Sequence, residues 1–110
     1  MNQREIWLAD LNPSVGSEQM GIRPVVIISG NAMNDNLGIS IICPLSSKIK
    51  QYAGCLVLTP DSKNGLDLES EVISFQVRAI SQSRLTRKIG EITIEQLEKL
   101  RIGLNEILRY

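Results

Sequence analysis

The sequence predicts a mainly β domain with a C-terminal helix, arranged as a small antiparallel barrel. Short apolar runs recur from residue 4 to residue 92 and are separated by turn-rich stretches. One amphipathic pattern with helical spacing follows them at the C-terminal end. The 110 residues contain no internal repeat and no linker, so they indicate a single domain over residues 1–110.

The opening run, REIWLADL, is expected to form the first strand because its residues alternate between two faces. Ile6 and Leu8 then lie on one face, and Trp7 and Ala9 lie on the other. A glycine-containing loop leads into PVVIIS, residues 24–29, which is a continuous β-branched run. Such a run is typical of a strand that is buried on both faces.

Three further strands are expected over residues 39–45, 55–60 and 71–81, and the last of them is long or bent. A short helical turn is expected in the connection before the first of these strands. We expect Pro44 to mark the end of that strand, because proline cannot donate to a ladder. Residues 83–92 are interpreted as a basic loop with one more short strand.

A helix is expected after Thr93, which is a good N-cap with Gln96 three residues later, the spacing of a capping box. Gly103 lies inside this helix and costs it about 1 kcal/mol relative to alanine. We interpret Gly103 as a point of close approach to another backbone. Apolar residues recur on one face of the helix, at Ile94, Leu97, Leu100, Leu104, Ile107 and Leu108.

Composition excludes several kinds of site. Twelve Lys and Arg residues balance twelve Asp and Glu residues, so any contact with nucleic acid must come from a local patch. The chain has no histidine, and Cys43 and Cys55 do not form a C-x-x-C pair, which removes most transition-metal sites. The missing histidine also removes the usual general base of hydrolytic triads.

The cellular compartment is predicted from what the sequence lacks. No apolar run approaches the length of a membrane span, and the first residues lack the layout of a secretory signal. We therefore expect a cytoplasmic protein with no membrane partner. In that reducing compartment Cys43 and Cys55 are expected to be buried thiols rather than a disulfide.

The loop Gly16–Pro24, with the sequence G-S-E-Q-M-G-I-R-P, is the first candidate site. On one interpretation its glycines supply positive φ angles in a hairpin loop and its charges are simply solvated. On the other, Arg23 emerges at the rim of the barrel because it directly precedes a buried strand. Glycines there would also let an anionic backbone approach main-chain N–H groups.

The second candidate is C-P-L-S-S-K, Cys43–Lys48, where Ser46 and Ser47 follow a buried strand. A serine in such a turn commonly bonds its own backbone. The functional interpretation places one hydroxyl opposite Arg23, so that both groups bind one phosphate. A third candidate is a basic set with Tyr52 among it, which is either a solvated face or a base-stacking surface. Its members are Lys48, Lys50, Arg84, Arg87 and Lys88.

These residues resemble the MazF/PemK (Kid) family of bacterial toxins. Members read close to G-x-E-Q-x-G-x-R-P followed by an apolar strand, and Gly16–Pro24 matches this pattern. CPLSS resembles the strand end where the family carries P-x-T-S or similar. EIWLADLNPSVG, VISFQVRAISQSRL and IGEITIEQLEKLRIGL resemble the opening strand, the later strand with its basic turn, and the closing strand and helix.

The resemblance implies an SH3-like barrel that pairs as a homodimer. It implies a metal-independent endoribonuclease that cuts single-stranded RNA at specific sequences and uses no cofactor. Its expected partner is a cognate antitoxin. Carried over residue by residue, the expected catalytic groups are Arg23, Ser46 and Glu18. The expected RNA-binding residues are Gln19, Ser47, Lys48, Gln76, Arg78, Arg84 and Arg87.

The chain departs from the family pattern at two functional positions. Phe75 stands where several members carry an acid before the glutamine, and Ser17 stands where one branch carries a histidine. Either Glu18 performs the proton transfer, or the chain cleaves slowly or not at all. The alternatives on the same fold are therefore an inhibitor that acts on a protein target, as the CcdB gyrase poisons do, and a binding module without catalysis.

Overall fold

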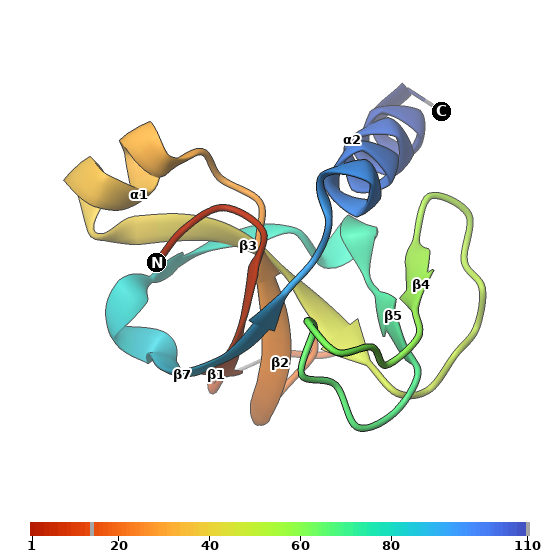
Figure 1. Cartoon of the computed structure of the whole chain (residues 1–110), viewed down its shortest axis with the longest axis horizontal. Helices are drawn as coiled ribbons and strands as arrows, with labels where there is room; N and C mark the ends of the chain where they lie inside the picture. Colours follow the sequence, from red (N-terminus) through yellow and green to blue (C-terminus); the bar gives the residue numbers. More distant parts are fainter. Residues whose placement is uncertain (14, 110) are drawn as a thin grey trace.

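The structure is a computed structural model that describes residues 1–13 and 15–109. This part of the chain folds as a strongly curved antiparallel sheet with two helices (Figure 1). The elements run in the order β1 (Glu5–Asp10), β2 (Ile22–Ile27), α1 (Asn31–Leu37), β3 (Ile39–Ser46), β4 (Leu56–Leu58), β5 (Ser70–Val72), η1 (Ser74–Gln76), β6 (Arg78–Ser81), η2 (Gln82–Arg84), β7 (Leu85–Glu91) and α2 (Ile94–Arg109).

The sheet is organised around β3. Its strands follow the order β4-β5-β3-β2-β1-β7, and β6 also pairs with β3. The first half of β3 pairs with β6 and the second half pairs with β5, while β2 lies along the other edge. The path begins at β4 and ends at β7, so the sheet is barrel-like but not closed. The prediction of a mainly β fold with a C-terminal helix is confirmed.

The predicted fifth strand is bent, as the sequence suggested. Residues 71–81 divide into the end of β5, the single turn η1 and β6. The turn lets both halves pair with the same long strand β3, at its two ends. It also places Phe75 and Gln76 at the bend, outside either ladder.

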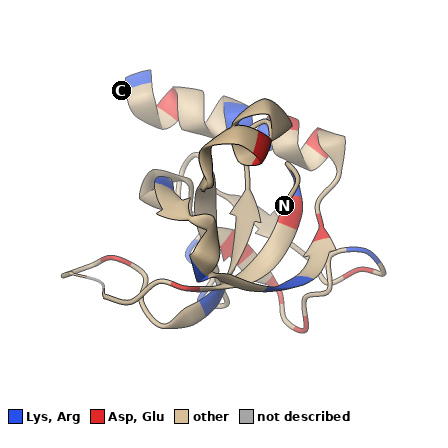
Figure 2. Cartoon of the chain, turned by 90° about the vertical axis from the view of Figure 1, so that its left-hand side faces the viewer, with Lys and Arg blue, Asp and Glu red and all other residues tan. Residues whose placement is uncertain are grey.

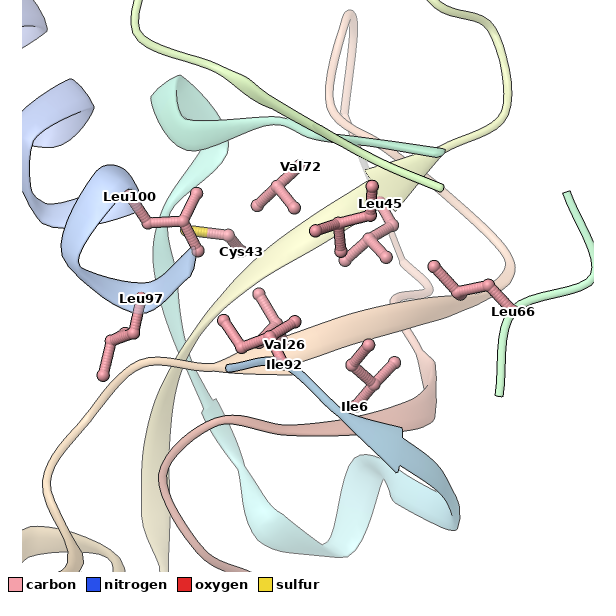
Figure 3. Packing of buried hydrophobic residues seen from close by; sticks show 10 residues of the cluster. Ile6, Val26, Cys43, Leu45, Leu66, Val72, Ile92, Leu97 and Leu100 are labelled. Carbon is pink, nitrogen blue, oxygen red and sulfur yellow. The ribbon is translucent and has the colours of Figure 1, made fainter. Parts of the chain in front are cut away.

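Two apolar clusters pack on the two faces of the sheet. Ile6 and Val26 belong to the larger cluster, together with Leu97 and Leu100 from α2 (Figure 3). Ala9 belongs to the other cluster, against which Trp7 packs, so the predicted division of β1 into two faces is confirmed. Val25 and Ile27 also face this second cluster, which explains why the apolar run in β2 is unbroken.

Helix α2 begins with the predicted capping box. The Thr93 N–H donates to Gln96 Oε1 over 2.8 Å, and the Gln96 N–H donates to Thr93 Oγ1 over 3.1 Å. The predicted close approach at Gly103 is also confirmed. A Cβ at this position would overlap the main-chain carbonyl oxygen of Gly54, in the loop before β4. Gly54 itself has φ of 80°, so the contact requires glycine on both sides.

Three predicted boundaries were wrong. Pro44 does not end β3, which continues to Ser46. The N–H and C=O of one strand residue point to the same edge. The Pro44 carbonyl accepts from the Ile73 N–H, so the missing N–H points away from β2 and costs the β2–β3 ladder no hydrogen bond. The predicted strand 55–60 contracts to Leu56–Leu58, which are the residues that pair with β5. The predicted basic loop is mostly strand, since β7 pairs along β1.

Charge and exposure agree with the composition. Acidic and basic residues are interspersed along the ribbon rather than separated on two sides (Figure 2). Cys43 and Cys55 are free thiols, but only Cys43 is buried as predicted, while Cys55 is half-buried. Burial together with the nearby Cys55 raises the pKa of Cys43 to about 12. Among the described residues, no helix is long and apolar enough to cross a membrane.

Candidate active site

The loop between β1 and β2, residues 11–21, is held by main-chain and amide contacts. The Leu11 N–H donates to the Gly21 carbonyl at 3.0 Å, which closes the base of the loop. The Asn12 side chain accepts from the Gly21 N–H at 3.1 Å. Gly16 and Gly21 have φ of 60° and 78°, as expected of a loop that needs left-handed residues. The described part of the loop, residues 11–13 and 15–21, is therefore tied at its base to the end of the sheet.

Gln76 fixes the far side of this loop. Its Oε1 accepts from the Gln19 N–H at 2.7 Å, and its Nε2 donates to the Ser17 carbonyl at 3.1 Å. Both ends of one side-chain amide therefore connect the turn η1 to the loop main chain. The contact gives Gln76 a structural role that does not depend on RNA. Its predicted RNA contact stays a prediction.

A cavity of about 440 Å³ lies beside the loop and is called here the Arg23 cavity. Its polar lining comes from β2, the residue after β3, the segment before β5, β5 itself, and β7. The residues concerned are Arg23, Ser47, Asp67, Ser70 and Arg87. Leu45 and Leu66 provide apolar wall. The cavity therefore brings two guanidinium groups, a carboxyl group and two hydroxyl groups to one hollow.

Arg23 is held by one of its three guanidinium nitrogens. Its Nε donates to the Met20 carbonyl at 2.7 Å, which fixes the side chain against the loop. Among the described residues, its two terminal nitrogens have no hydrogen-bonding partner. The side chain is half-buried and lines the cavity. A guanidinium held in this way offers two donors in a fixed direction, which suits a phosphate.

The two serines face different hollows. The ladder between β2 and β3 ends at the pair Val25–Pro44, before Arg23 and Ser46 are reached. Beyond it, Ser47 lines the Arg23 cavity, whereas Ser46 lines a second hollow. Ser46 Oγ is buried and accepts from the Lys48 N–H at 3.2 Å. The predicted self-bonding turn is therefore present, and the hydroxyl retains its own proton to donate.

The second hollow, about 240 Å³, is called the Ser46 hollow. It lies between the loop, the end of β3 and the turn η1. It is lined by Ser17, Gln19, Ser46, Lys48, Lys50, Tyr52, Ile73, Phe75 and Gln76. Four of the predicted site residues, Gln19, Ser46, Lys48 and Gln76, thus meet here rather than beside Arg23.

Glu18 is separated from both hydroxyl-bearing hollows. It is exposed, and its Oε1 accepts from the Val15 N–H at 2.8 Å. It lines a third hollow with Gln19, Phe75 and Arg78, and this hollow includes neither Arg23 nor Ser46. The structure therefore groups Glu18 with Arg78, while the carboxyl group that shares a cavity with Arg23 is that of Asp67.

The predicted basic residues have different surroundings. Arg87 lines the Arg23 cavity and is exposed. Arg84 instead donates from Nη1 to the main-chain oxygens of Asp10 and Asn12, at 3.2 and 2.7 Å. Lys88 pairs with Glu5 at 3.1 Å on the sheet. Arg87 is thus exposed in the cavity, whereas Arg84 and Lys88 are bound to other parts of the fold.

A buried carboxylate supports the loop that carries the lysines. Glu71, in β5, is fully buried. Its two oxygens accept from the N–H groups of Lys50, Gln51 and Tyr52, at 2.9, 3.2 and 2.9 Å. Gln51 has a positive φ of 55°, which turns these successive N–H groups toward one anion. Within the described residues Glu71 makes no ion pair, so these contacts alone compensate for its burial.

Comparison with known proteins decides the family. The family described as "PemK-like, MazF-like toxin of type II toxin-antitoxin system" matches residues 2–108. The chain belongs to this toxin family. Endoribonuclease EndoA of Bacillus subtilis is 32% identical over 97 residues, which cover 87% of this chain and 84% of the relative. Endoribonuclease MazF9 of Mycobacterium tuberculosis is 31% identical over 105 residues, covering 91% and 89%.

Solved structures of MazF proteins share the fold. The crystal structure of MazF from Deinococcus radiodurans superposes with a TM-score of 0.86 at 25% identity, covering all of this chain and 97% of that one. The Mycobacterium tuberculosis toxin MazF-mt6 gives a TM-score of 0.80 at 22% identity, covering 96% of each chain. The open, curved sheet with its C-terminal helix is thus the MazF-like fold.

The sequence did not point to two acidic residues of this region, Asp67 and Glu71. Asp67 lies in a polar turn segment, and nothing in its neighbourhood distinguishes it from a solvated residue. Glu71 follows the acidic stretch and lies at the head of a strand, where burial of a carboxylate is unexpected. Within the described residues, no group of three or more His, Cys, Asp or Glu side chains is arranged to hold a metal ion.

Proposed function

We propose that this MazF-like toxin is an endoribonuclease that cuts single-stranded RNA without a metal ion, using the substrate's own 2′-hydroxyl as nucleophile. The observation that carries the proposal is the Arg23 cavity. It brings Arg23, with two terminal nitrogens uncommitted among the described residues, together with Arg87 and the Asp67 carboxyl group. The relatives named endoribonucleases support the same class of reaction.

Arg23 would bind two nonbridging oxygens of the scissile phosphate. An arginine remains protonated at neutral pH, so it is a poor base but a strong charge-assisted donor. Its fixed Nε–Met20 contact directs the terminal nitrogens before substrate arrives. Donors held in advance stabilise the charge that accumulates on the phosphorus oxygens in the transition state. Arg87 in the same cavity adds a second positive charge.

The reaction needs a base and an acid as well. A base takes the 2′-hydroxyl proton, the 2′-oxygen attacks phosphorus, and the bond to the 5′-oxygen breaks. The departing oxygen takes a proton, which leaves a 2′,3′-cyclic phosphate and a 5′-hydroxyl end. Asp67 is the carboxyl group that shares the Arg23 cavity, so we assign it the base in preference to Glu18. Ser47 is placed to orient the substrate there.

The proposed biological partners are single-stranded RNA, a cognate antitoxin and a second copy of the chain in a homodimer. Unstacked bases are accessible to small hollows, whereas paired bases are not. Structures of MazF-fold endoribonucleases include one "in complex with its cognate antitoxin" from Mycobacterial species. Ile94, Ile102 and Leu108 leave large apolar side chains exposed on α2, which a partner chain would cover. A cytoplasmic location fits an RNA substrate.

Cleavage of a long single-stranded RNA in EDTA tests the function. The purified chain should give discrete fragments with cyclic-phosphate and 5′-hydroxyl ends. Once a cut site is mapped, an oligonucleotide is made in which only the nucleotide on the 5′ side of the cut bond carries a 2′-deoxy sugar. It should bind but remain uncut. Cleavage of that oligonucleotide would exclude attack by the 2′-hydroxyl. Activity that requires an added divalent ion would contradict the metal-independent reaction.

A further inference from the structure

We propose that Tyr52 and Phe75 form a stacking site for one unpaired RNA base beside Ser46, an inference that rests on the proposed ribonuclease function. The two rings lie with centroids 5.1 Å apart and planes at 86°, in an edge-to-face arrangement. Both line the Ser46 hollow. We call them the aromatic pair.

The aromatic pair is exposed although it is apolar. The exposed fraction is 45% for Tyr52 and 48% for Phe75. Neither ring belongs to the two buried apolar clusters that pack on the sheet. In an edge-to-face pair, the edge of one ring covers one face of the other, and the opposite face of that second ring stays open to a flat partner. A nucleobase is flat and apolar on its faces, so it matches this surface.

The surroundings of the aromatic pair favour nucleic acid over an apolar peptide. Lys48 and Lys50 line the same hollow and are exposed, with no carboxylate among its lining residues. Within the described residues, neither lysine ammonium makes an ion pair. A base on the rings would therefore have its phosphate close to two free cations, next to the Ser46 hydroxyl.

Both aromatic residues are held in place before ligand binds. Tyr52 follows two residues whose N–H groups, like its own, donate to the buried Glu71 carboxylate. Phe75 lies in the turn η1, whose Gln76 side chain is bonded at both ends to the loop 11–21. These contacts fix the main chain that carries both rings, so less conformational freedom is lost when a base binds, and stacking contributes more of its free energy to affinity.

The aromatic pair also explains Phe75, which stands in the place of an acid. An aromatic ring at this position cannot accept a proton, but it can select for a nucleotide with a strongly stacking base. We therefore assign Phe75 to substrate selection, next to the catalytic cavity. The proton transfer is left to the Arg23 cavity on the other side of the loop.

The test measures binding of single-stranded RNA oligonucleotides that carry 2′-O-methyl groups and cannot be cut. Phe75→Leu keeps apolar volume and removes the ring, whereas Phe75→Trp keeps a ring. Loss of one stacked base is expected to weaken binding about 5- to 150-fold in Phe75→Leu and Tyr52→Ala. Phe75→Trp and the control Tyr52→Phe should bind as the parent does. Melting temperatures should agree because Phe75 is half exposed.

Abasic substitution then identifies the base. In the parent, removing the base at one position of the oligonucleotide should cause a similar loss, and in Phe75→Leu the same removal should cause none. Equal binding by Phe75→Leu, or losses that simply add at every position, would overturn the proposal. Weaker antitoxin binding with unchanged RNA binding would likewise overturn it and assign the aromatic pair to a protein interface. If the parent cuts no RNA, the ribonuclease function fails, while this binding experiment still decides whether the stacking site exists.

Discussion

Arg23 and Arg84 both lie near the end of β1, where the loop to β2 begins, and they use their guanidinium groups differently. Arg84 donates from Nη1 to the carbonyls of Asp10 and Asn12, where β1 ends and the loop begins. Among the described residues Arg23 is bonded only through Nε, and the residue lines the Arg23 cavity. One arginine therefore stabilises the loop, and the other is held by the loop for a ligand. A basic residue near a site is not by itself evidence of a binding role.

The carboxyl groups show the same contrast. Glu18 accepts from the Val15 N–H, and Glu71 is fully committed to three main-chain N–H groups. Asp67 lies in the Arg23 cavity and, among the described residues, has no hydrogen bond or ion pair. The contrast predicts which acids affect catalysis and which affect folding.

The largest effect is expected from Asp67→Asn. Loss of the general base should reduce kcat on the order of 10²- to 10⁴-fold, with little change in RNA binding. Single-turnover cleavage at saturating enzyme measures this step. Glu18→Gln is the matched variant and should retain most of the activity, because its carboxyl group lies outside the Arg23 cavity. The reverse ranking would return the proton transfer to Glu18 and break the contrast between the acids.

An intermediate effect is expected from Glu71→Gln. The amide has one acceptor oxygen instead of two, and its NH₂ group faces main-chain donors, so we expect a loss of about 1–3 kcal/mol of unfolding free energy. Chemical denaturation measures it. Glu69→Gln, on the exposed segment two residues earlier, is the control and should change stability little. RNA affinity should fall with Glu71→Gln, because Tyr52 loses its support. Unchanged stability would show that the buried contacts contribute nothing.

The smallest effect is expected on the pH dependence of stability, through the Glu5 carboxyl group. Burial raises the pKa of Glu5, but hydrogen bonds from the Asn2 N–H, Trp7 Nε1 and Lys88 outweigh it, so the pKa lies below the ordinary value of 4.5. A carboxyl group with a lowered folded-state pKa contributes stability above its unfolded value, and this is lost as pH falls through the folded value.

Unfolding free energy should therefore decline from about pH 4.5 downward, with a shallower decline in Glu5→Gln. Urea denaturation from pH 6 to pH 3 measures both profiles. Glu69→Gln again provides a control, since its exposed side chain has no such contacts among the described residues. Identical slopes for the parent and Glu5→Gln would show that the Glu5 contacts do not stabilise the folded state.

The fold could largely be predicted from the sequence, because periodicity and capping act locally. The Thr93–Gln96 capping box and the two buried faces of β2 followed directly from residue order. The interpretation of Gly103 as a close contact was also correct. Pro44 was misjudged because proline ends a strand only where a neighbouring strand needs its N–H. Which strands lie on its two edges is a tertiary property.

The site was less predictable, since it depends on which side chains already form hydrogen bonds or ion pairs within the protein. Sequence identified Arg23, Ser46, Ser47 and the basic patch, but it could not separate Arg84 from Arg23 or place Ser46 and Arg23 in different hollows. Asp67 and Glu71 became visible only through the cavity and the buried contacts. Both residues gain their surroundings from segments that are far apart in the sequence and meet only in the folded chain.

Arg23→Ala measured beside Arg84→Ala tests the central contrast most directly. Both variants are assayed for kcat/KM on a cleavable oligonucleotide and for unfolding free energy. Arg23→Ala should lose activity on the order of 10²- to 10³-fold while its unfolding free energy stays near that of the parent. Arg84→Ala should lose stability, by about 1–3 kcal/mol, and keep most of its activity at low temperature. A destabilised Arg23→Ala, or an active one, would contradict the assignment of Arg23 to the phosphate.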